Sequence, residues 1–151
     1  MISKYLFYGL FFVTLGANAQ GYNSNRIAFT NFLVRMYNAA PFEGVRAVED
    51  YDRAYLISVL TLDKTKYKTE AALNRIASVK AMAQASRYFS GSDITQEMII
   101  HITESDGISD VKIIESIQEN SVGYVRALEQ LTNFTRNDGM QVFIFAAKLD
   151  L

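Results

Sequence analysis

His101 has the clearest capacity for chemistry, because it is the only histidine in the chain. It follows Glu97 by four residues in a segment with strand-like alternation, so we expect both side chains on one face of a strand, two pleats apart. A carboxylate and an imidazole so placed can bind a metal ion or transfer a proton. A working site of either kind needs further ligands or a nucleophile, and the sequence has no second histidine and no cysteine. Glu97 and His101 are therefore the candidate site residues, and we expect His101 to be structural or solvent-facing.

A second group of oxygen ligands surrounds Gly107 and consists of Glu104, Asp106 and Asp110. These acids lack the alternating spacing and the final glutamate of an EF-hand calcium loop, so a solvated turn is the expectation. The sequence also has no glycine-rich phosphate loop, no nucleophile elbow and no paired-histidine motif. Without cysteine, disulfides, thiolate zinc sites and thiol catalysis are excluded. We predict no catalytic residue, no metal site and no cofactor, and a protein that is not an enzyme.

The composition indicates one folded domain. The chain has 151 residues, a net charge of −1, 50% hydrophobic residues and one proline, which together exclude a disordered or fibrous chain. The balanced charge argues against nucleic-acid binding, which needs an excess of basic residues. Charge is nevertheless uneven along the chain: residues 63–87 hold six basic and two acidic residues (+4), and residues 93–119 hold seven acidic residues and one basic residue (−6). The simplest explanation is that the two charged segments face solvent on opposite sides of one domain. The alternative is that they steer a partner toward the protein or direct its self-assembly.

The first nineteen residues have the features of a secretory signal peptide. Lys4 precedes an apolar run over residues 5–15, and residues 17–19 read Ala-Asn-Ala, a small-residue cleavage signal. The run is too short for a membrane-spanning helix, which needs about 20 apolar residues, and no later stretch is long enough. We predict cleavage after Ala19, a single α+β domain over residues 20–151 with no transmembrane segment, and a periplasmic or secreted location. An exported chain without cysteine also favours a bacterial envelope.

The first half of the mature chain predicts a helix followed by two strands. Apolar spacing predicts a helix over residues 25–38, before Pro41. Strands are predicted over 45–48 and 55–62, joined by the polar turn 49–53. Both faces of the second strand are apolar, which is typical of an interior strand covered on both sides.

An alanine-rich helix over residues 69–89 is the strongest prediction, with Thr69 as its cap. Its core-facing stripe is predicted from the helical spacing of Ala72, Ile76, Val79 and Ala83, widened by Leu73, Ala77, Met82, Ala85 and Phe89. Strand-like alternation follows over 94–103. Residues 110–120 favour a short helix, although a strand also fits their spacing. Asp138-Gly139 predicts a tight turn between strands 122–128 and 140–149, and the last of these is apolar on both faces. The order αββαβ(α)ββ describes an α+β domain, in which the long central helix and an N-terminal helix pack on an antiparallel sheet of about five strands.

Several of these segments carry a family resemblance: the strand YLISVL from residue 55, the alanine-rich helix, GSDIT from residue 91, NSVGYV from residue 120 and DGMQVFI from residue 138. Residues 55–149 resemble the small envelope domain of the LPP20 lipoprotein family, which also occurs as the N-terminal domain of a flagellar assembly protein. The chain departs from the lipoprotein members because it has no lipid-bearing cysteine and adds an N-terminal helix. The end of the signal peptide is similar to those of exported Bacteroidetes proteins. The resemblance implies a non-enzymatic envelope module and transfers no catalytic residue.

The chain has an export signal and no recognisable set of catalytic residues. We therefore predict a non-enzymatic binding or assembly module of the bacterial cell envelope, whose partner is an envelope protein or a second copy of the chain. Two alternatives stay open. One is a small hydrolase or metal-dependent enzyme that uses Glu97 and His101. The other is a carrier that encloses an apolar small molecule between the sheet and the central helix.

Overall fold

The computed structural model describes residues 17–91, 94–102 and 107–151. The chain divides into two compact units, one that ends at Ala39 and one from Ala40 to Leu151. The first unit contains α1 (Ala17–Ala39), which includes the helix predicted over 25–38 and ends shortly before Pro41, where a helix cannot easily continue. Residues 1–16 of the predicted signal peptide lie outside the described residues, so cleavage after Ala19 stays a prediction.

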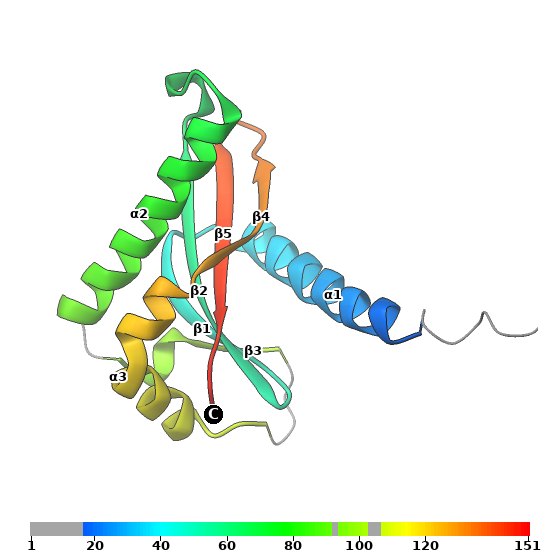
Figure 1. The fold of residues 1–151 in the computed structure, drawn as a ribbon, viewed down its shortest axis with the longest axis vertical. Helices are drawn as coiled ribbons and strands as arrows, with labels where there is room; N and C mark the ends of the chain where they lie inside the picture. The colour runs from blue at the N-terminus through cyan, green and yellow to red at the C-terminus, as the bar shows by residue number, and fades with distance from the viewer. Residues whose placement is uncertain (1–16, 92–93, 103–106) are drawn as a thin grey trace, which may run out of the picture. The chain divides into compact units, whose positions relative to one another are not determined.

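The second unit contains a five-stranded sheet in the order β3-β1-β2-β5-β4 (Figure 1). Every pair of neighbouring strands is antiparallel except β1 and β3, which are parallel. The prediction of an α+β fold with the order αββαβαββ is confirmed, and so is the interior position of the two strands that are apolar on both faces, β2 and β5. The strands are β1 (Gly44–Asp50), β2 (Arg53–Leu62), β3 (Ile99–His101), β4 (Glu129–Thr135) and β5 (Gln141–Lys148).

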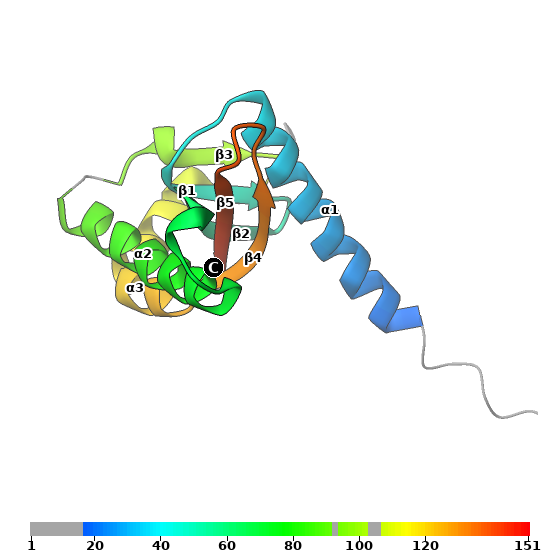
Figure 2. The ribbon, with the colours of Figure 1, turned by 90° about the horizontal axis from the view of Figure 1, so that it is seen from above.

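Two helices, α2 (Glu70–Gly91) and α3 (Asp110–Arg126), cover the same face of the sheet (Figures 1 and 2). Thr69 caps α2 as predicted, because its Oγ1 accepts a hydrogen bond from the Ala72 N–H at 3.1 Å. In the part of the chain that the structure describes, no helix is both long enough and apolar enough to cross a membrane.

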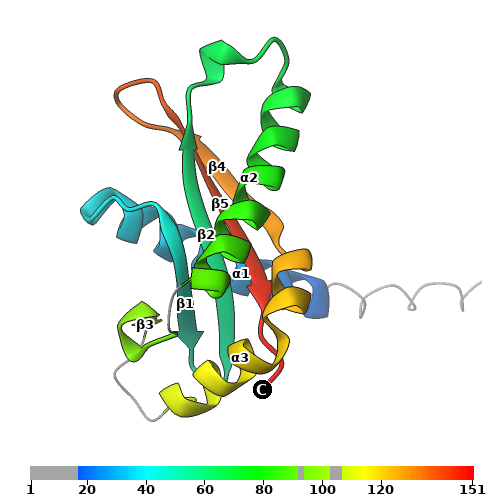
Figure 3. The ribbon, with the colours of Figure 1, turned by 90° about the vertical axis from the view of Figure 1, so that its left-hand side faces the viewer.

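The helix α2 lies very close to the sheet. Its buried residues recur every four positions and are mostly small: Leu73, Ala77, Ala81 and Ala85. The buried Ser58 hydroxyl of β2 donates to the Ala81 carbonyl of the helix at 3.1 Å. Gln84 in turn donates from Nε2 to Ser58 Oγ and to the Val59 carbonyl, both at 3.0 Å. A direct bond between a strand side chain and the helix backbone is possible only because alanine keeps the two elements close. Figure 3 shows α2 in front of the sheet, running across β2 and β5.

The central helix is confirmed, although its buried stripe differs from part of the predicted one. Ala72 and Val79 were expected to face the core, whereas Ala72 is exposed and Val79 is 60% exposed. The observed stripe follows strict four-residue spacing from Leu73, because the alanines on that line allow the closest approach to β2.

Three predicted boundaries were wrong. The polar turn 49–53 is only two residues long, since β1 continues to Asp50 and β2 starts at Arg53. The strand predicted over 94–103 is reduced to Ile99–His101, because a 3-10 turn (Gln96–Met98, η2) precedes it and brings the consecutive residues Met98 and Ile99 both into the core.

The third wrong boundary lies between α3 and β4. Residues 122–126 of the strand predicted over 122–128 belong to α3, and the strand that pairs with β5 is Glu129–Thr135. Despite a kink at Asn120, α3 continues because Tyr124 is buried with Ile117, two helical turns earlier. The Tyr124 hydroxyl also lies 2.6 Å from Ser116 Oγ.

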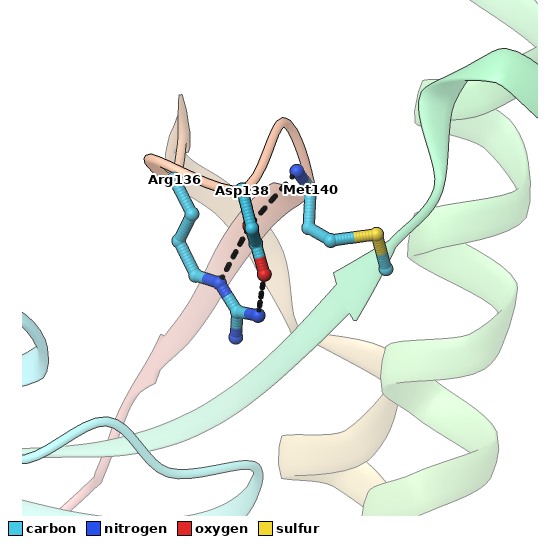
Figure 4. Close-up of polar contacts among 3 residues, drawn as sticks. All are labelled: Arg136, Asp138 and Met140. Carbon is cyan, nitrogen blue, oxygen red and sulfur yellow. Dashed lines mark hydrogen bonds and ion pairs between the residues drawn. The ribbon is translucent and has the colours of Figure 1, made fainter.

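The turn between β4 and β5 occurs where Asp138-Gly139 predicted it. Gly139 has a φ of +84°, and its N–H donates to the Arg136 carbonyl at 3.0 Å, as in a three-residue hairpin loop with glycine in the left-handed region. Asp138 Oδ1 accepts bonds from Arg136 Nε and from the Met140 N–H, both at 3.1 Å (Figure 4). The Arg136 guanidinium also bonds to Asp138 Oδ2.

Replacing Ala81 with leucine is expected to lower the free energy of unfolding by about 1–3 kcal/mol, because the larger side chain pushes α2 away from β2 and stretches the bond to Ser58. Urea denaturation measures the change. The matched control is Ala83→Leu, on the exposed side of the same helix, which is expected to change stability by less than about 0.5 kcal/mol. Equal effects of the two variants would contradict the close contact.

The side chain of Arg136, followed by the backbone N–H of Met140, lowers the pKa of Asp138 below the usual aspartate value. The ionised carboxylate therefore stabilises the hairpin at pH values above the unfolded-state pKa, and this contribution is lost as the pH falls through the lower folded-state pKa. We expect Arg136→Gln to raise the pKa of Asp138, measured by carboxyl carbon NMR titration. Asp63 is the internal control, because its pKa is lowered mainly by Thr65 and should not move. An unchanged Asp138 pKa would show that Arg136 has no such role.

Candidate functional site

Glu49 is the most unusual residue of the second unit, because it is a charged side chain that is only 3% exposed. It lies near the end of β1 on the same face as Val45 and Ala47, which belong to the core beneath the helices. Burying a carboxylate without a partner is very unfavourable. The fold must therefore bring a hydrogen-bond donor to this position.

His101 supplies that donor. The parallel pairing of β1 with β3 sets His101 directly opposite Glu49, and the Ile102 N–H donates to the Glu49 carbonyl at 3.1 Å. Nδ1 of His101 lies 2.5 Å from Glu49 Oε2. At this distance an Nδ1–H group can donate a hydrogen bond to the carboxylate.

Asp110, the first residue of α3, faces the other side of the imidazole ring. Its Oδ1 lies 3.2 Å from His101 Nε2. The His101 side chain is 42% exposed and that of Asp110 is 28% exposed, so this side of the ring is open to solvent, whereas the Glu49 side is closed. The imidazole thus lies between two carboxylates from different elements, β1 and α3.

Glu97 and His101 were predicted to share one strand, and the structure places them in two consecutive elements. Glu97 belongs to the 3-10 turn before β3 and is exposed, and the interactions described for His101 lead to Glu49 and Asp110 instead. Of the three acids considered as a calcium turn, Glu104 and Asp106 lie outside the described residues. Only Asp110 is placed, and it faces His101.

Gly107 closes the site over Glu49. A β-carbon at this position would collide with Oε1 of Glu49 and would lie 3.1 Å from the carbonyl oxygen of Tyr51. Tyr51 itself has a φ of +57°, a left-handed conformation that is strained for a residue with a side chain. The backbone is therefore packed tightly around the buried carboxylate, and only glycine fits at position 107.

The arrangement can do two kinds of chemistry. Within the described ranges, Glu49, His101 and Asp110 form a group that can offer three metal-ligand atoms, all within 4.8 Å of one another. A buried carboxylate that accepts from Nδ1 is also the arrangement that orients the imidazole of a general base. However, a carboxylate of the same chain stands in front of Nε2, where such a base would meet its substrate.

A separate hollow of about 430 Å³ lies at the opposite end of the sheet. The start of α2 forms one side of it, and the β4–β5 hairpin forms the other. Its lining is mostly polar and includes two lysines; the residues are Lys64, Tyr67, Lys68, Thr69, Glu70, Leu73, Asn74, Asn133, Thr135, Gln141 and Phe143. Its side chains can offer ammonium, amide and hydroxyl donors to a ligand.

Comparisons with protein-family models, with curated proteins and with solved structures found no match to the chain.

Replacing Gly107 with alanine is expected to lower the free energy of unfolding by about 1–3 kcal/mol, because the added β-carbon must displace Glu49 or the backbone at Tyr51. Denaturant unfolding gives the loss of stability, and NMR of the single imidazole reports the disturbed contact with Glu49. The control is Gly91→Ala at the end of α2, where nothing lies within 4 Å of the added atom. A Gly107→Ala protein as stable as the wild type, with an unchanged His101 spectrum, would contradict the tight packing.

Proposed function

We propose that the chain is an exported, non-enzymatic binding or assembly module of the bacterial cell envelope, related to the LPP20-like envelope domain. The observation that carries this proposal is the polar hollow between the start of α2 and the β4–β5 hairpin. It is a concave surface, and small molecules and protein side chains bind preferentially in concave sites. The signal-peptide features of residues 1–19 and the envelope resemblance of residues 55–149 support a role in the periplasm or outside the cell.

The charge around the hollow favours an acidic partner. Lys64 and Lys68 line it, and Lys66 and Arg75 lie on the same stretch of chain and are exposed. Opposite charges on two surfaces accelerate association and exclude wrong partners. The partner is an acidic surface of an envelope protein or of a second copy, whose residues 93–119 are strongly acidic.

A binding role fits the placement of the single histidine better than catalysis does. Both ring nitrogens of His101 face carboxylates of its own chain, and they connect β1, β3 and α3. The enzyme alternative built on Glu97 and His101 requires a structure in which these two side chains meet. The carrier alternative requires a predominantly apolar lining, whereas lysine, amide and hydroxyl groups line the hollow beside Leu73 and Phe143.

Reversing the charges at the hollow is expected to weaken partner binding. We expect the double variant Lys64→Glu, Lys68→Glu to lose at least about ten-fold in affinity, because it turns a complementary contact into a repulsive one. Capture of partners from the native envelope fraction identifies the bound protein, and titration of that protein at two salt concentrations measures affinity and its salt dependence.

The matched control is Arg126→Glu, Lys148→Glu, which makes the same charge change at two exposed positions away from the hollow and outside residues 93–119. This control should bind like the wild type. Equal binding by both double variants would refute the hollow as the docking site. Recovery of neither a specific partner nor an oligomer would refute the binding role itself.

A further inference from the structure

We propose that His101 Nε2 and Asp110 Oδ1 bind a divalent transition-metal ion of the zinc type, with Glu49 as the buried carboxylate that orients the imidazole. This goes beyond the binding role proposed above and differs from the sequence-based expectation that the chain has no metal site. The argument depends on the two sides of the imidazole ring, which differ in distance and exposure.

On the buried side, the contact is a hydrogen bond. Nδ1 lies 2.5 Å from Oε2 of Glu49, an arrangement in which Nδ1–H donates to the carboxylate and Nε2 is the nitrogen left to bind an ion. Metal-binding histidines almost always donate their other N–H to a carboxylate, a carbonyl or water, which fixes the tautomer and makes the free nitrogen a better ligand. Glu49 has this role by its burial and its register opposite His101.

On the exposed side, two electron-rich atoms face one another. With the proton on Nδ1, both Nε2 of His101 and Oδ1 of Asp110 are acceptors, so either a second proton or a metal ion must lie between them. A charge-assisted N–H to carboxylate bond has a length of about 2.7–2.9 Å. The observed separation is 3.2 Å, at the long end of the range for an ordinary N–H to oxygen bond. It matches the separation of about 3.3 Å between two ligands of one tetrahedral zinc ion with bonds of about 2.0–2.1 Å.

Charge and access agree with this assignment. With a neutral imidazole the cluster contains two carboxylates and no positive charge, and a divalent cation would neutralise it. The His101 side chain is 42% exposed, so an ion can reach Nε2 and keep water at its remaining positions. Imidazole and carboxylate ligands suit zinc, and cobalt occupies such sites with a visible spectrum that reports its geometry.

The composition makes the experiment unusually direct. The chain has one histidine and no cysteine, so in a protein purified without a histidine tag any imidazole–metal signal comes from His101. We expect zinc titration followed by calorimetry to show one ion per chain. NMR should show a shift of the His101 Nε2 resonance with Nδ1 still protonated, and cobalt should give a visible absorption band that zinc removes.

Four conservative variants assign the ligands. His101→Gln should lose the specific binding, and Asp110→Asn should weaken it at least about ten-fold. Glu49→Gln retains an acceptor for Nδ1–H but loses the charge. We expect its metal affinity to fall by about 10–100-fold, as when the carboxylate partner of a metal-binding histidine is replaced in other proteins. Glu97→Gln is the matched control and should bind like the wild type, because Glu97 is exposed in the turn before β3. Circular dichroism checks the folding of each variant.

Two results would overturn the proposal. The first is the absence of binding at millimolar zinc, with a doubly protonated imidazole in the wild-type spectrum, which would show that a proton alone joins His101 to Asp110. The second is unchanged binding in His101→Gln, which would mean that surface carboxylates hold the ion. If His101→Gln does not fold, Asp110→Asn and the Nε2 resonance of the wild type still decide the question. None of these measurements depends on the partner that binds at the hollow.

Discussion

The close approach of α2 to β2 is the constraint on which the second unit depends. Ala77, Ala81 and Ala85 remove side-chain volume along one line of the helix, so that Ser58 reaches a helix carbonyl directly. A polar residue with no exposed surface is tolerated there because its hydroxyl both donates to Ala81 and accepts from Gln84. With α2 held in this position, α3 packs beside it on the same face, and the interior strands β2 and β5 are covered.

The buried charge of Glu49 is the second constraint, and it explains how the short edge strand β3 is held to the sheet. A strand of three residues contributes few backbone bonds, so β3 alone is a poor edge. The Glu49–His101 contact and the bond from the Ile102 N–H join this short strand to β1 through side chain and backbone together. Asp110 connects the start of α3 to the same imidazole. The candidate site therefore also holds β1, β3 and α3 together, and variants at this site need a test of folding.

Local sequence patterns were sufficient to predict the secondary structure of segments whose own residue spacing determines it. The alanine-rich helix with its Thr69 cap, the interior strands and the Asp138-Gly139 turn were all predicted correctly. The failures have two physical origins. For α3 the cause is local, because Tyr124 is buried on the helix two turns after Ile117, whereas for Glu49 and β4 it is contact between segments distant in sequence. In the sequence, Glu49 looks like part of a polar turn. Its alternation with Val45 and Ala47 nevertheless indicates that its side chain faces the core. Its partner, His101, can be identified only once the pairing of β1 with β3 is known. In the same way β4 is too polar to stand out as a strand, and it forms because β5 offers it an edge.

The two candidate regions lie at opposite ends of β2. Glu49 pairs with Ala54 near the first end of this strand, whereas Gln141, which lines the hollow, pairs with Leu62 at the other. At about 3.3 Å per residue, the eight steps from Ala54 to Leu62 separate them by about 26 Å. Substitutions so far apart with no shared partner act independently, and charges at that distance are screened in physiological salt. Within one chain, a change at one end is therefore expected to leave the other end unchanged.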